Sequence, residues 1–307
     1  MTQACAQAAE QLKPLVTVLV NCFNGEKFLV KAVQSVLDQT YQNWELVFWD
    51  NCSTDRSAEV YQSFTDSRLR YFLAPHHTVL YEARNYALEY ARGDLIAFLD
   101  VDDWWDEDKL SLQVELFDSP QVGFVYGNYW LENESKGKTT LAFSKDLPEG
   151  RGADALLTNY AVGMLTLMIR RSLFCGDHGG FDPRFLIVGD FDLVIRMAGI
   201  TEYRAVQKPI AHYRWHGANI TSNAIGRHAE ELQMWLKKVS HSTEFQESPA
   251  LTGIRNLYKY KLGQAQVQEG RRWQSFKTML SITNRSMQVR LFAFLILPRA
   301  MHRGLRA

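Results

Sequence analysis

The sequence lacks the features that would place it outside the ordinary globular proteins. It has only four cysteines among 307 residues, and no CxxC pair, which excludes zinc-ribbon and dithiol redox sites of that spacing. No run reaches the roughly 18–20 apolar residues of a membrane-spanning helix. The longest candidate is LFAFLILP at 291–298. Residues 1–13 contain no long apolar core, so no signal peptide is expected and the cysteines are expected to be reduced thiols in the cytoplasm.

The chain also lacks net charge, because 34 Lys and Arg residues balance 34 Asp and Glu residues. Nearly half of the residues are hydrophobic (46%), as in a folded globular protein. The overall charge therefore gives no support to nucleic-acid binding, which needs a basic surface. The length allows one large domain or two ordinary ones.

Short apolar runs alternate with helical patterns in the first hundred residues. LVTVLV (15–20), WELVFW (44–49) and LIAFL (95–99) are apolar without alternation, as expected for strands buried on both faces of a parallel sheet. Helical spacing follows the first run in EKFLVKAVQSVLDQ and precedes the last in YEARNYALEYA. This order predicts a doubly wound α/β sheet.

Beyond residue 105 the pattern is mixed, and from about 225 it is helical to the end. The expected elements are a helix at 108–117, a strand at 122–130, a strand running into a short helix at 164–174, a helix at 189–199 and a strand at 203–216. No internal repeat is evident.

The stretch FLDVDDWW, residues 98–105, places three carboxylates within four positions at the end of a predicted strand. Burying them costs on the order of several kcal/mol each unless they are compensated. A hard divalent cation, Mg²⁺ or Mn²⁺, with phosphate and water as further ligands, would compensate them. The alternative is a capping cluster in which Asp102 or Asp103 starts the helix that contains Lys109. Asp50 also follows a predicted strand, so both acidic sites are expected at the ligand-binding carboxyl edge of the sheet.

An ordered set of motifs resembles glycosyltransferase family 2, the inverting enzymes with the GT-A fold. The segments are VTVLVNCFNGEKFLVKAVQSVLDQTYQNWELVFWDNCSTD, ARNYALEYARGDLIAFLDVDDWW, GDFDLVIRMA and YRWHGANIT, and they cover about residues 15–222. The resemblance implies a nucleotide-sugar donor, usually a UDP-sugar, with Mn²⁺ or Mg²⁺ bridging its two phosphates. It also implies a Rossmann-like, mostly parallel sheet flanked by helices in a catalytic domain at 1–222, with a nucleotide-binding half at 15–105 and an acceptor half at 106–222. A helical region at 223–307 would follow.

By this resemblance the acidic triplet contacts the metal and the ribose. Asp102, the last Asp of the D-x-D, is expected to ligate the metal, and Asp100 to face the ribose hydroxyls, the metal or both. Asp103 is expected to be structural, as a helix cap. His216 in YRWHGANIT is either a third metal ligand, acceptable for Mn²⁺, or a loop histidine bonded to phosphate or backbone.

The resemblance also implies that the first two loops after strands bind the nucleoside. Asp50 resembles the family residue that accepts from the uracil N3–H, and its alternative is a turn-forming role in DNCSTD. The family usually has a second Asp where this chain has Asn51. Asn24 and Glu26 would line the nucleoside pocket. The alternatives are a backbone role for Asn24 and a helix N-terminal role for Glu26.

Arg84 lies in the ARN motif, just before the predicted metal-binding strand. By resemblance it would present a cationic fork to the base or the phosphates. The alternative is an ion pair on the helix surface with Glu82 or Glu89. Both interpretations remain open from the sequence.

Inverting transfer needs a group that removes a proton from the acceptor hydroxyl. GDFDLVIRMA offers two carboxylates, of which Asp192 stands four residues before Arg196 and is assigned to a local ion pair. The family places its catalytic base at the position of Asp190, so Asp190 is the predicted base, and a simple N-cap is the alternative. The family commonly has an acidic pair here, whereas this chain has Gly189 before Asp190, which removes one way of raising the pKa of the base.

The last part of the chain is basic, since residues 271–307 contain no Asp or Glu and many Arg, interleaved with apolar residues. A cationic, apolar helix suits the surface of an anionic bilayer, and enzymes of this family often act on lipid-linked acceptors at the cytoplasmic membrane face. The alternative is a terminal helix that packs LFAFLIL on the catalytic domain and leaves the arginines in water. The tail has no recognisable nucleic-acid module.

The sequence therefore predicts a cytoplasmic, metal-dependent inverting glycosyltransferase, peripheral at the inner face of the membrane if the tail binds lipid. Its acceptor would be a saccharide or a lipid-linked molecule in the synthesis of a bacterial surface polysaccharide or glycolipid. A nucleotidyltransferase is one rival, although NCFNGEKF is a poor version of its Gly-rich phosphate loop. A non-catalytic relative that binds nucleotide-sugars is the other, and it would lack the base.

Overall fold

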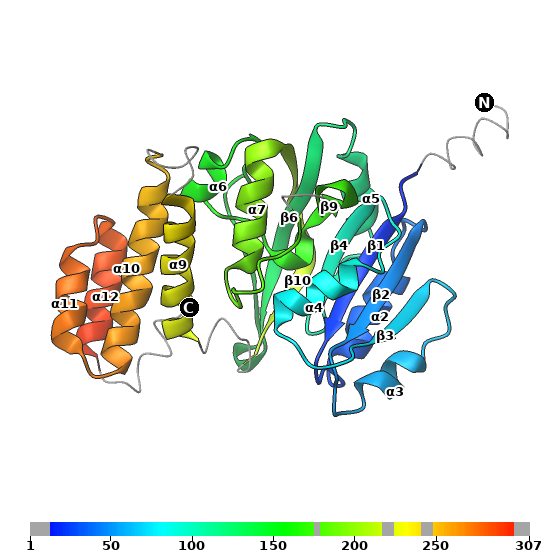
Figure 1. Cartoon of the computed structure of the whole chain (residues 1–307), viewed down its shortest axis with the longest axis horizontal. Coiled ribbons are helices and arrows are strands. Elements are labelled where there is room, and N and C mark those ends of the chain that lie inside the picture. The colour runs from blue at the N-terminus through cyan, green and yellow to red at the C-terminus, as the bar shows by residue number, and fades with distance from the viewer. Residues whose placement is uncertain (1–12, 175–178, 217–223, 241–247, 298–307) are drawn as a thin grey trace. The chain divides into compact units, whose positions relative to one another are not determined.

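The computed structural model describes residues 13–174, 179–216, 224–240 and 248–297. The strands are β1 (Val16–Cys22), β2 (Trp44–Asp50), β3 (Leu69–Leu73), β4 (Leu95–Asp100), β5 (Trp104–Trp105), β6 (Val122–Asn133), β7 (Lys138–Leu141), β8 (Gly150–Arg151), β9 (Met168–Arg170) and β10 (Glu202–Trp215). The helices are α2 (Leu29–Leu37), α3 (Ser57–Gln62), α4 (Leu80–Leu88), α5 (Lys109–Glu115), α6 (Asp154–Thr158), α7 (Gly189–Ile200), α9 (Ile225–Ser240), α10 (Leu251–Gln268), α11 (Arg272–Leu280) and α12 (Arg285–Ile296). The predicted α/β class is confirmed (Figure 1).

All strands belong to one sheet, in the order β3-β2-β1-β4-β9-β6-β10-β5, with β7 paired to β6 and β8 to β10. The first four strands in this order are parallel. β1 and β2 are buried at every position, which explains their continuous apolar sequences. In the register, Cys22 of β1 lies beside Asp50 of β2, and Asn21 of β1 lies beside Asp100 of β4. The two acidic strand ends therefore flank the end of β1.

The other half of the sheet mixes directions. β9 runs antiparallel between β4 and β6, and β10 runs parallel to β6. The segment expected to be a strand running into a short helix is a shorter strand, β9, between two 3-10 turns at Met164–Thr166 and Arg171–Phe174. β5 pairs antiparallel with β10, where Trp105 lies opposite Ala211. This pairing holds the turn after β4 against the end of β10.

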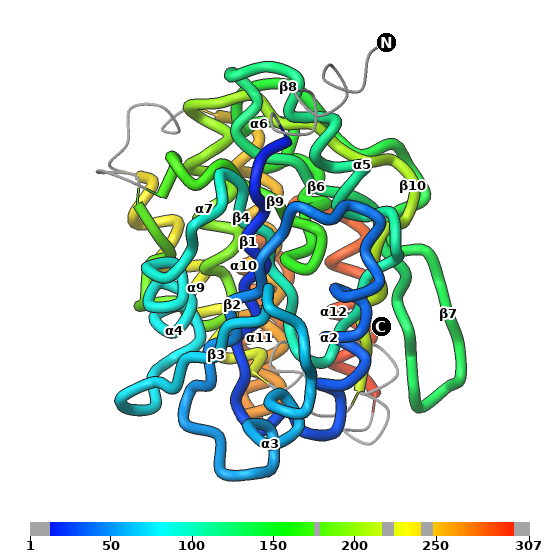
Figure 2. The backbone as a smooth tube through the Cα atoms, turned by 90° about the vertical axis from the view of Figure 1, so that its right-hand side faces the viewer, coloured from blue at the N-terminus to red at the C-terminus, as the bar shows by residue number. Residues whose placement is uncertain are grey.

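Helices cover both faces of the sheet. α4 and α7 lie on one side of β1, and α2 and α5 lie on the other (Figure 2). α2 buries Leu29, Ala32, Val33 and Val36, the spacing expected of a helix with one apolar face. Side chains of α4 and α7 can therefore meet above one face of the sheet.

The chain divides into two compact units. The first comprises residues up to Gly152 and Ala161–Trp215, and contains the sheet. The second comprises Ala153–Tyr160 and the residues after Trp215, and contains α6 and α9 to α12. In the second unit, α10, α11 and α12 share a core of Val267, Met279, Ile282, Leu291, Phe294 and Leu295. Of the helices that the structure describes, none has the length and apolarity needed to cross a bilayer.

Candidate functional site

A buried arginine compensates the first carboxylate of the acidic stretch. Arg84 of α4 is 3% exposed, and its Nη2 lies 2.5 Å from Oδ1 of Asp100 at the end of β4. The Asp100 side chain is 36% exposed, so the pair sits at the rim of the sheet. Arg84 thus forms its ion pair with Asp100. The predicted alternative, an ion pair on the helix surface with Glu82 or Glu89, is wrong. The reason is that the side chain turns inward from α4 toward β4.

Arg214, near the end of β10, holds the other two acidic residues. Its backbone N–H donates to Oδ1 of Asp103 at 2.9 Å, and its Nε donates to the carbonyl oxygen of Asp102 at 2.7 Å. Burial, together with the charges of Asp102 and Asp100, raises the pKa of Asp103 well above its ordinary value. The expected role of Asp103 as a helix cap is wrong, because β5 follows it and α5 begins only at Lys109.

The side chain of Asp102, which lies in sequence between the paired Asp100 and the buried Asp103, is partly exposed. Among the residues that the structure describes, no three His, Cys, Asp or Glu side chains are grouped so that they could hold a metal ion by themselves. Asp100 and Asp102 nevertheless fit a hard divalent cation, because Mg²⁺ and Mn²⁺ accept one or two protein carboxylates and take phosphate and water oxygens as further ligands. His216 directly follows β10 and is partly buried, and its role as a further ligand stays a prediction.

Asp50 is 1% exposed at the end of β2. Its Oδ1 accepts from the Ser53 N–H and its Oδ2 from the Tyr71 hydroxyl, each at 2.8 Å. The bond to Ser53 supports the turn-forming interpretation, and a nucleobase N–H would need one of the remaining lone pairs of the carboxylate. The next residue, Asn51, donates to the Thr78 carbonyl and accepts from the Thr78 N–H. A carboxylate could not make both bonds, which explains why an amide occupies position 51 in this chain.

Asn24 and Glu26 tie the loop after β1 to the loop after β2. Asn24 has a left-handed backbone with φ of 56°, and its Oδ1 accepts from the Thr54 N–H at 2.8 Å. Oε2 of Glu26 accepts from the Arg56 N–H at 2.8 Å. The N–H groups of both residues donate back to side chains of the second loop. Both residues are exposed and fix the shape of this rim, so their contact with a nucleoside stays a prediction.

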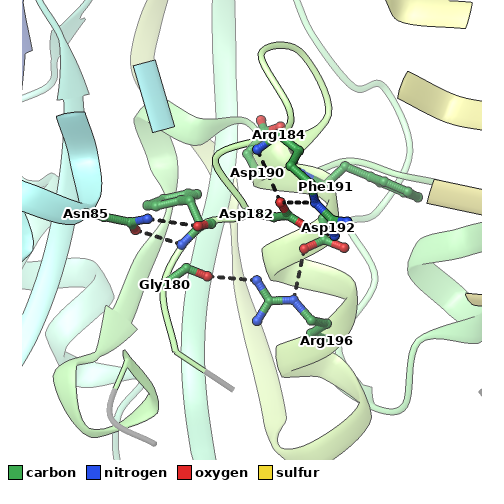
Figure 3. A network of polar contacts seen from close by, with 9 residues as sticks. Asn85, Gly180, Asp182, Arg184, Asp190, Phe191, Asp192 and Arg196 are labelled. Carbon is green, nitrogen blue, oxygen red and sulfur yellow. Dashed lines mark hydrogen bonds and ion pairs between the residues drawn. The ribbon is translucent and has the colours of Figure 1, made fainter. Parts of the chain in front are cut away.

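The start of α7 carries the two carboxylates of GDFDLVIRMA (Figure 3). Asp192 is buried, and its Oδ2 accepts from Nε of Arg196 at 2.9 Å, which confirms the predicted ion pair. Arg196 also donates to the Gly180 carbonyl in the loop before α7. The N-cap position is Val188, so the interpretation of Asp190 as a simple N-cap is wrong. Asp190 lies inside the first turn and on a different side of the helix from Asp192.

Asp190 interacts with α4 rather than with a second acid. Its Oδ1 accepts from the Tyr81 hydroxyl at 3.1 Å and from the Phe191 N–H at 2.8 Å. Burial raises the pKa of Asp190, and the Phe191 N–H, the Arg84 charge and the Tyr81 hydroxyl act in the opposite direction. A Cβ at Gly189 would lie 2.4 Å from the Tyr81 ring. The glycine therefore leaves the room that the tyrosine ring occupies.

Sequence reasoning missed Tyr81, Asn85 and Arg214. Asn85 donates to the Phe181 carbonyl and accepts from the Phe181 N–H, both at 2.8 Å, which ties the loop before α7 to α4 (Figure 3). Asn85 and Arg214 stand inside motifs that the sequence already singled out, so their position was a usable signal. For Tyr81 the only signal is indirect, namely the glycine at position 189 where an acid is common.

The ion pair of Arg84 can be tested through stability. Arg84→Met leaves Asp100 without its cation, and we expect the free energy of unfolding to fall by about 1–3 kcal/mol in urea titrations. Adding Asp100→Asn should cost less in the Arg84→Met background than in the wild type, with a coupling of about 1 kcal/mol because Asp100 is partly screened by water. The control is the exposed pair of Arg56, the N-cap residue of α3, and Glu59, in which no measurable coupling is expected. Additive costs for Arg84 and Asp100 would contradict the pairing.

Comparison with known proteins shows the family of the chain. The sequence model of the family described as Glycosyl transferase family 2 matches residues 17–175. The Escherichia coli protein named UDP-Glc:alpha-D-GlcNAc-diphosphoundecaprenol beta-1,3-glucosyltransferase WfgD is 35% identical over 161 residues, which are 52% of this chain and 61% of WfgD. The putative teichuronic acid biosynthesis glycosyltransferase TuaG of Bacillus subtilis is 36% identical over 161 residues, 52% of this chain and 63% of TuaG. The match thus spans about three fifths of the length of these relatives.

Solved structures share the fold at low sequence identity. Staphylococcus aureus TarS 1–349 in complex with UDP-GlcNAc has a TM-score of 0.62 at 13% identity, over 95% of this chain and 89% of that one. The mannosyltransferase PcManGT from Pyrobaculum calidifontis, in complex with GDP-Man and Mn²⁺, has a TM-score of 0.63 at 17% identity, over 96% and 85%. These likenesses agree with the GT-A fold expected from the motifs. Because the family model spans more than half of the 307 residues, the chain belongs to glycosyl transferase family 2.

Proposed function

We propose that this protein is an inverting glycosyltransferase that moves a sugar from a UDP-sugar to a lipid-linked saccharide in the synthesis of a surface polysaccharide. The observation that carries the proposal is that one helix, α4, contacts both carboxylates: its Arg84 pairs with Asp100 at the sheet edge and its Tyr81 donates to Asp190. The names of WfgD, with UDP-Glc and a diphosphoundecaprenol acceptor, and of TuaG, with teichuronic acid, support the donor and acceptor classes.

Asp190 is proposed as the general base. The hydrogen bonds from Tyr81 and Phe191 both hold Oδ1, so Oδ2 is proposed as the atom that takes the proton of the acceptor hydroxyl. The acceptor oxygen then bonds to the sugar carbon while the bond from that carbon to the diphosphate oxygen breaks. The raised pKa of Asp190 strengthens it as a base.

Tyr81 is proposed to orient Asp190 through its hydroxyl, which donates to Oδ1 and, unlike a neighbouring acid, lowers the pKa of the base. Burial and the nearby Asp190 raise the pKa of Tyr81 well above 10, so its hydroxyl stays protonated and donates. The ring is held in place by stacking on Phe181, with centroids 5.1 Å apart. Gly189 makes this arrangement possible, since any side chain there would displace the ring.

The sheet edge is proposed as the donor site. Asp102 and Asp100 would hold Mn²⁺ or Mg²⁺, with His216 as a candidate further ligand, and the ion would stabilise the charge that develops on the leaving nucleoside diphosphate. Asn24, Glu26 and Asp50 would shape the nucleoside pocket through the loops that they fix. An anionic membrane surface is proposed as the place where the acceptor is met.

Asp190→Asn tests the base directly. The amide keeps the size of the side chain and loses its basicity, so we expect the transfer rate to fall by roughly 10²–10⁴-fold while UDP-sugar binding, followed by calorimetry, is unchanged. Asp182→Asn changes a carboxylate in the loop before α7 and should leave the rate within about twofold of the wild type. Normal transfer by Asp190→Asn would refute the assigned base, and equal losses in both variants would point to a structural effect.

Tyr81→Phe tests how the base is tuned. The hydroxyl lowers the pKa of Asp190, so its removal should raise that pKa and move the acidic limb of the pH–rate profile to higher pH. The base is active above its pKa, so the loss of rate should be largest at low pH and shrink as the pH rises. Among the described residues, Arg84 and Tyr129 are ionisable groups that also act with Asp190, and both are unchanged in the variant. Tyr86→Phe on the same helix should leave the limb where it is; an unshifted limb in Tyr81→Phe would contradict the role of the hydroxyl.

The donor and metal can be found by thermal shift. A ligand at a hundred times its Kd stabilises the folded state by about 2.7 kcal/mol, which is a shift of several degrees for a chain of this size. We expect UDP-sugars with Mn²⁺ to raise the Tm more than GDP- or dTDP-sugars do, and EDTA to remove most of the effect. Indifference to every nucleotide would refute the proposed function.

A further inference from the structure

Two helices of the second unit present apolar side chains to solvent. On α12, Leu291, Phe294 and Leu295 are buried in the core shared with α10 and α11. Val289, Phe292 and Ile296 of the same helix are 62%, 48% and 62% exposed. The apolar run LFAFLIL is therefore divided between a core and an outer surface. The buried side packs on α10 and α11 and not, as the alternative expected, on the catalytic domain, and contact of the other side with a membrane stays a prediction.

The exposed side chains form stripes at helical spacing. On α12, Arg285, Val289, Phe292 and Ile296 follow one another by four, three and four positions. On α11, Trp273, Lys277 and Leu280 follow one another by four and three positions. Trp273 and Leu280 are 67% and 63% exposed. Both stripes lie opposite the residues that their helices bury. We call the two stripes together the outer face of α11 and α12, defined by Trp273, Lys277, Leu280, Arg285, Val289, Phe292 and Ile296.

The charges around the outer face have one sign. Arg272, Lys277, Arg285 and Arg290 are exposed, and within the described part of the chain none of these four has an ion pair. Arg271, by contrast, pairs with Glu269 at the end of α10. No Asp or Glu occurs from 271 to 297. Two copies of this face would repel each other, so the surface favours an anionic partner over a second copy of the chain.

We infer that the outer face of α11 and α12 binds the surface of an anionic lipid bilayer. Apolar stripes flanked by Arg and Lys, with an exposed Trp, are the pattern of helices that lie in the headgroup region, where the aromatic ring meets the apolar boundary and the cations meet lipid phosphates. With 9 and 12 residues, α11 and α12 are too short to span a bilayer, so they would lie on its surface. The inference deepens the proposed function and rests on it in one respect, because a lipid-linked acceptor is reached at a membrane surface.

Vesicle sedimentation of the full chain, without nucleotide or acceptor, tests the inference. We expect binding to vesicles of phosphatidylcholine and phosphatidylglycerol, weak binding to pure phosphatidylcholine, and loss of binding as salt is raised. The variant Arg272→Gln/Lys277→Gln/Arg285→Gln/Arg290→Gln should partition on the order of a hundredfold more weakly. The variant Trp273→Ser/Phe292→Ser/Ile296→Ser should also partition at least about tenfold more weakly, since it loses three apolar anchors and no charge.

A matched control removes four exposed cations elsewhere, Lys136→Gln/Lys138→Gln/Arg151→Gln/Lys237→Gln, and should bind anionic vesicles like the wild type. Unfolding curves of all variants establish that the fold is kept. Equal pelleting of the wild type and both outer-face variants overturns the inference. A change in the oligomeric state of the Trp273→Ser/Phe292→Ser/Ile296→Ser variant without lipid also overturns it, because the face would then be an interface between copies of the chain.

The failure of the membrane inference can be distinguished from the failure of the proposed function. Asp190→Asn should bind vesicles like the wild type, because the base is not part of the outer face. Vesicle binding in a chain that transfers no sugar would refute the enzyme proposal alone. Transfer to a water-soluble acceptor by a chain that ignores anionic vesicles would refute the membrane inference alone.

Discussion

The buried guanidinium of Arg84 is the constraint on which the site depends. A buried charge without a partner is strongly destabilising, so this side chain requires acidic groups around it. Asp100 supplies an ion pair at 2.5 Å from the end of β4, and Asp190 adds its charge from α7. The same cation therefore fixes α4 against the sheet and favours the ionised form of the carboxylate that is proposed as the base. The acidic edge of the sheet and Asp190 are electrostatically linked through one residue.

The three carboxylates of the acidic stretch differ in burial and in their partners. Asp103 is 2% exposed, accepts from the Arg214 backbone and has a raised pKa, so it is a structural group of the turn. Asp100 has one oxygen on Arg84 and keeps part of its surface in solvent. Asp102 is partly exposed between them. The crowded carboxylates are thus tolerated because Asp103 is buried and accepts from the Arg214 N–H, and because Asp100 is paired with Arg84.

Much of the fold followed from the sequence because it depends on local pattern. The buried strands β1, β2 and β4, the spacing of α2 and the ion pair of Asp192 with Arg196 four residues later are all set by neighbours along the chain. The contacts of Arg84 with Asp100 and of Tyr81 with Asp190 were not predicted. They join residues on different elements, and helix or strand periodicity does not specify which side chains meet across a sheet. The helix-cap assignment of Asp103 failed for the same reason, since the pairing of β5 with β10 intervenes.

The most direct test of this account is calorimetry of UDP binding with and without Mn²⁺ in two neighbouring variants. In Asp102→Asn we expect that Mn²⁺ no longer strengthens UDP binding, because the carboxylate that would hold the ion is gone. In Asp103→Asn we expect Mn²⁺ still to strengthen binding, since position 103 is 2% exposed and the amide oxygen can accept from the Arg214 N–H as the carboxylate does. A wild-type response in Asp102→Asn, or its loss in a folded Asp103→Asn, would contradict the assignment of the two carboxylates.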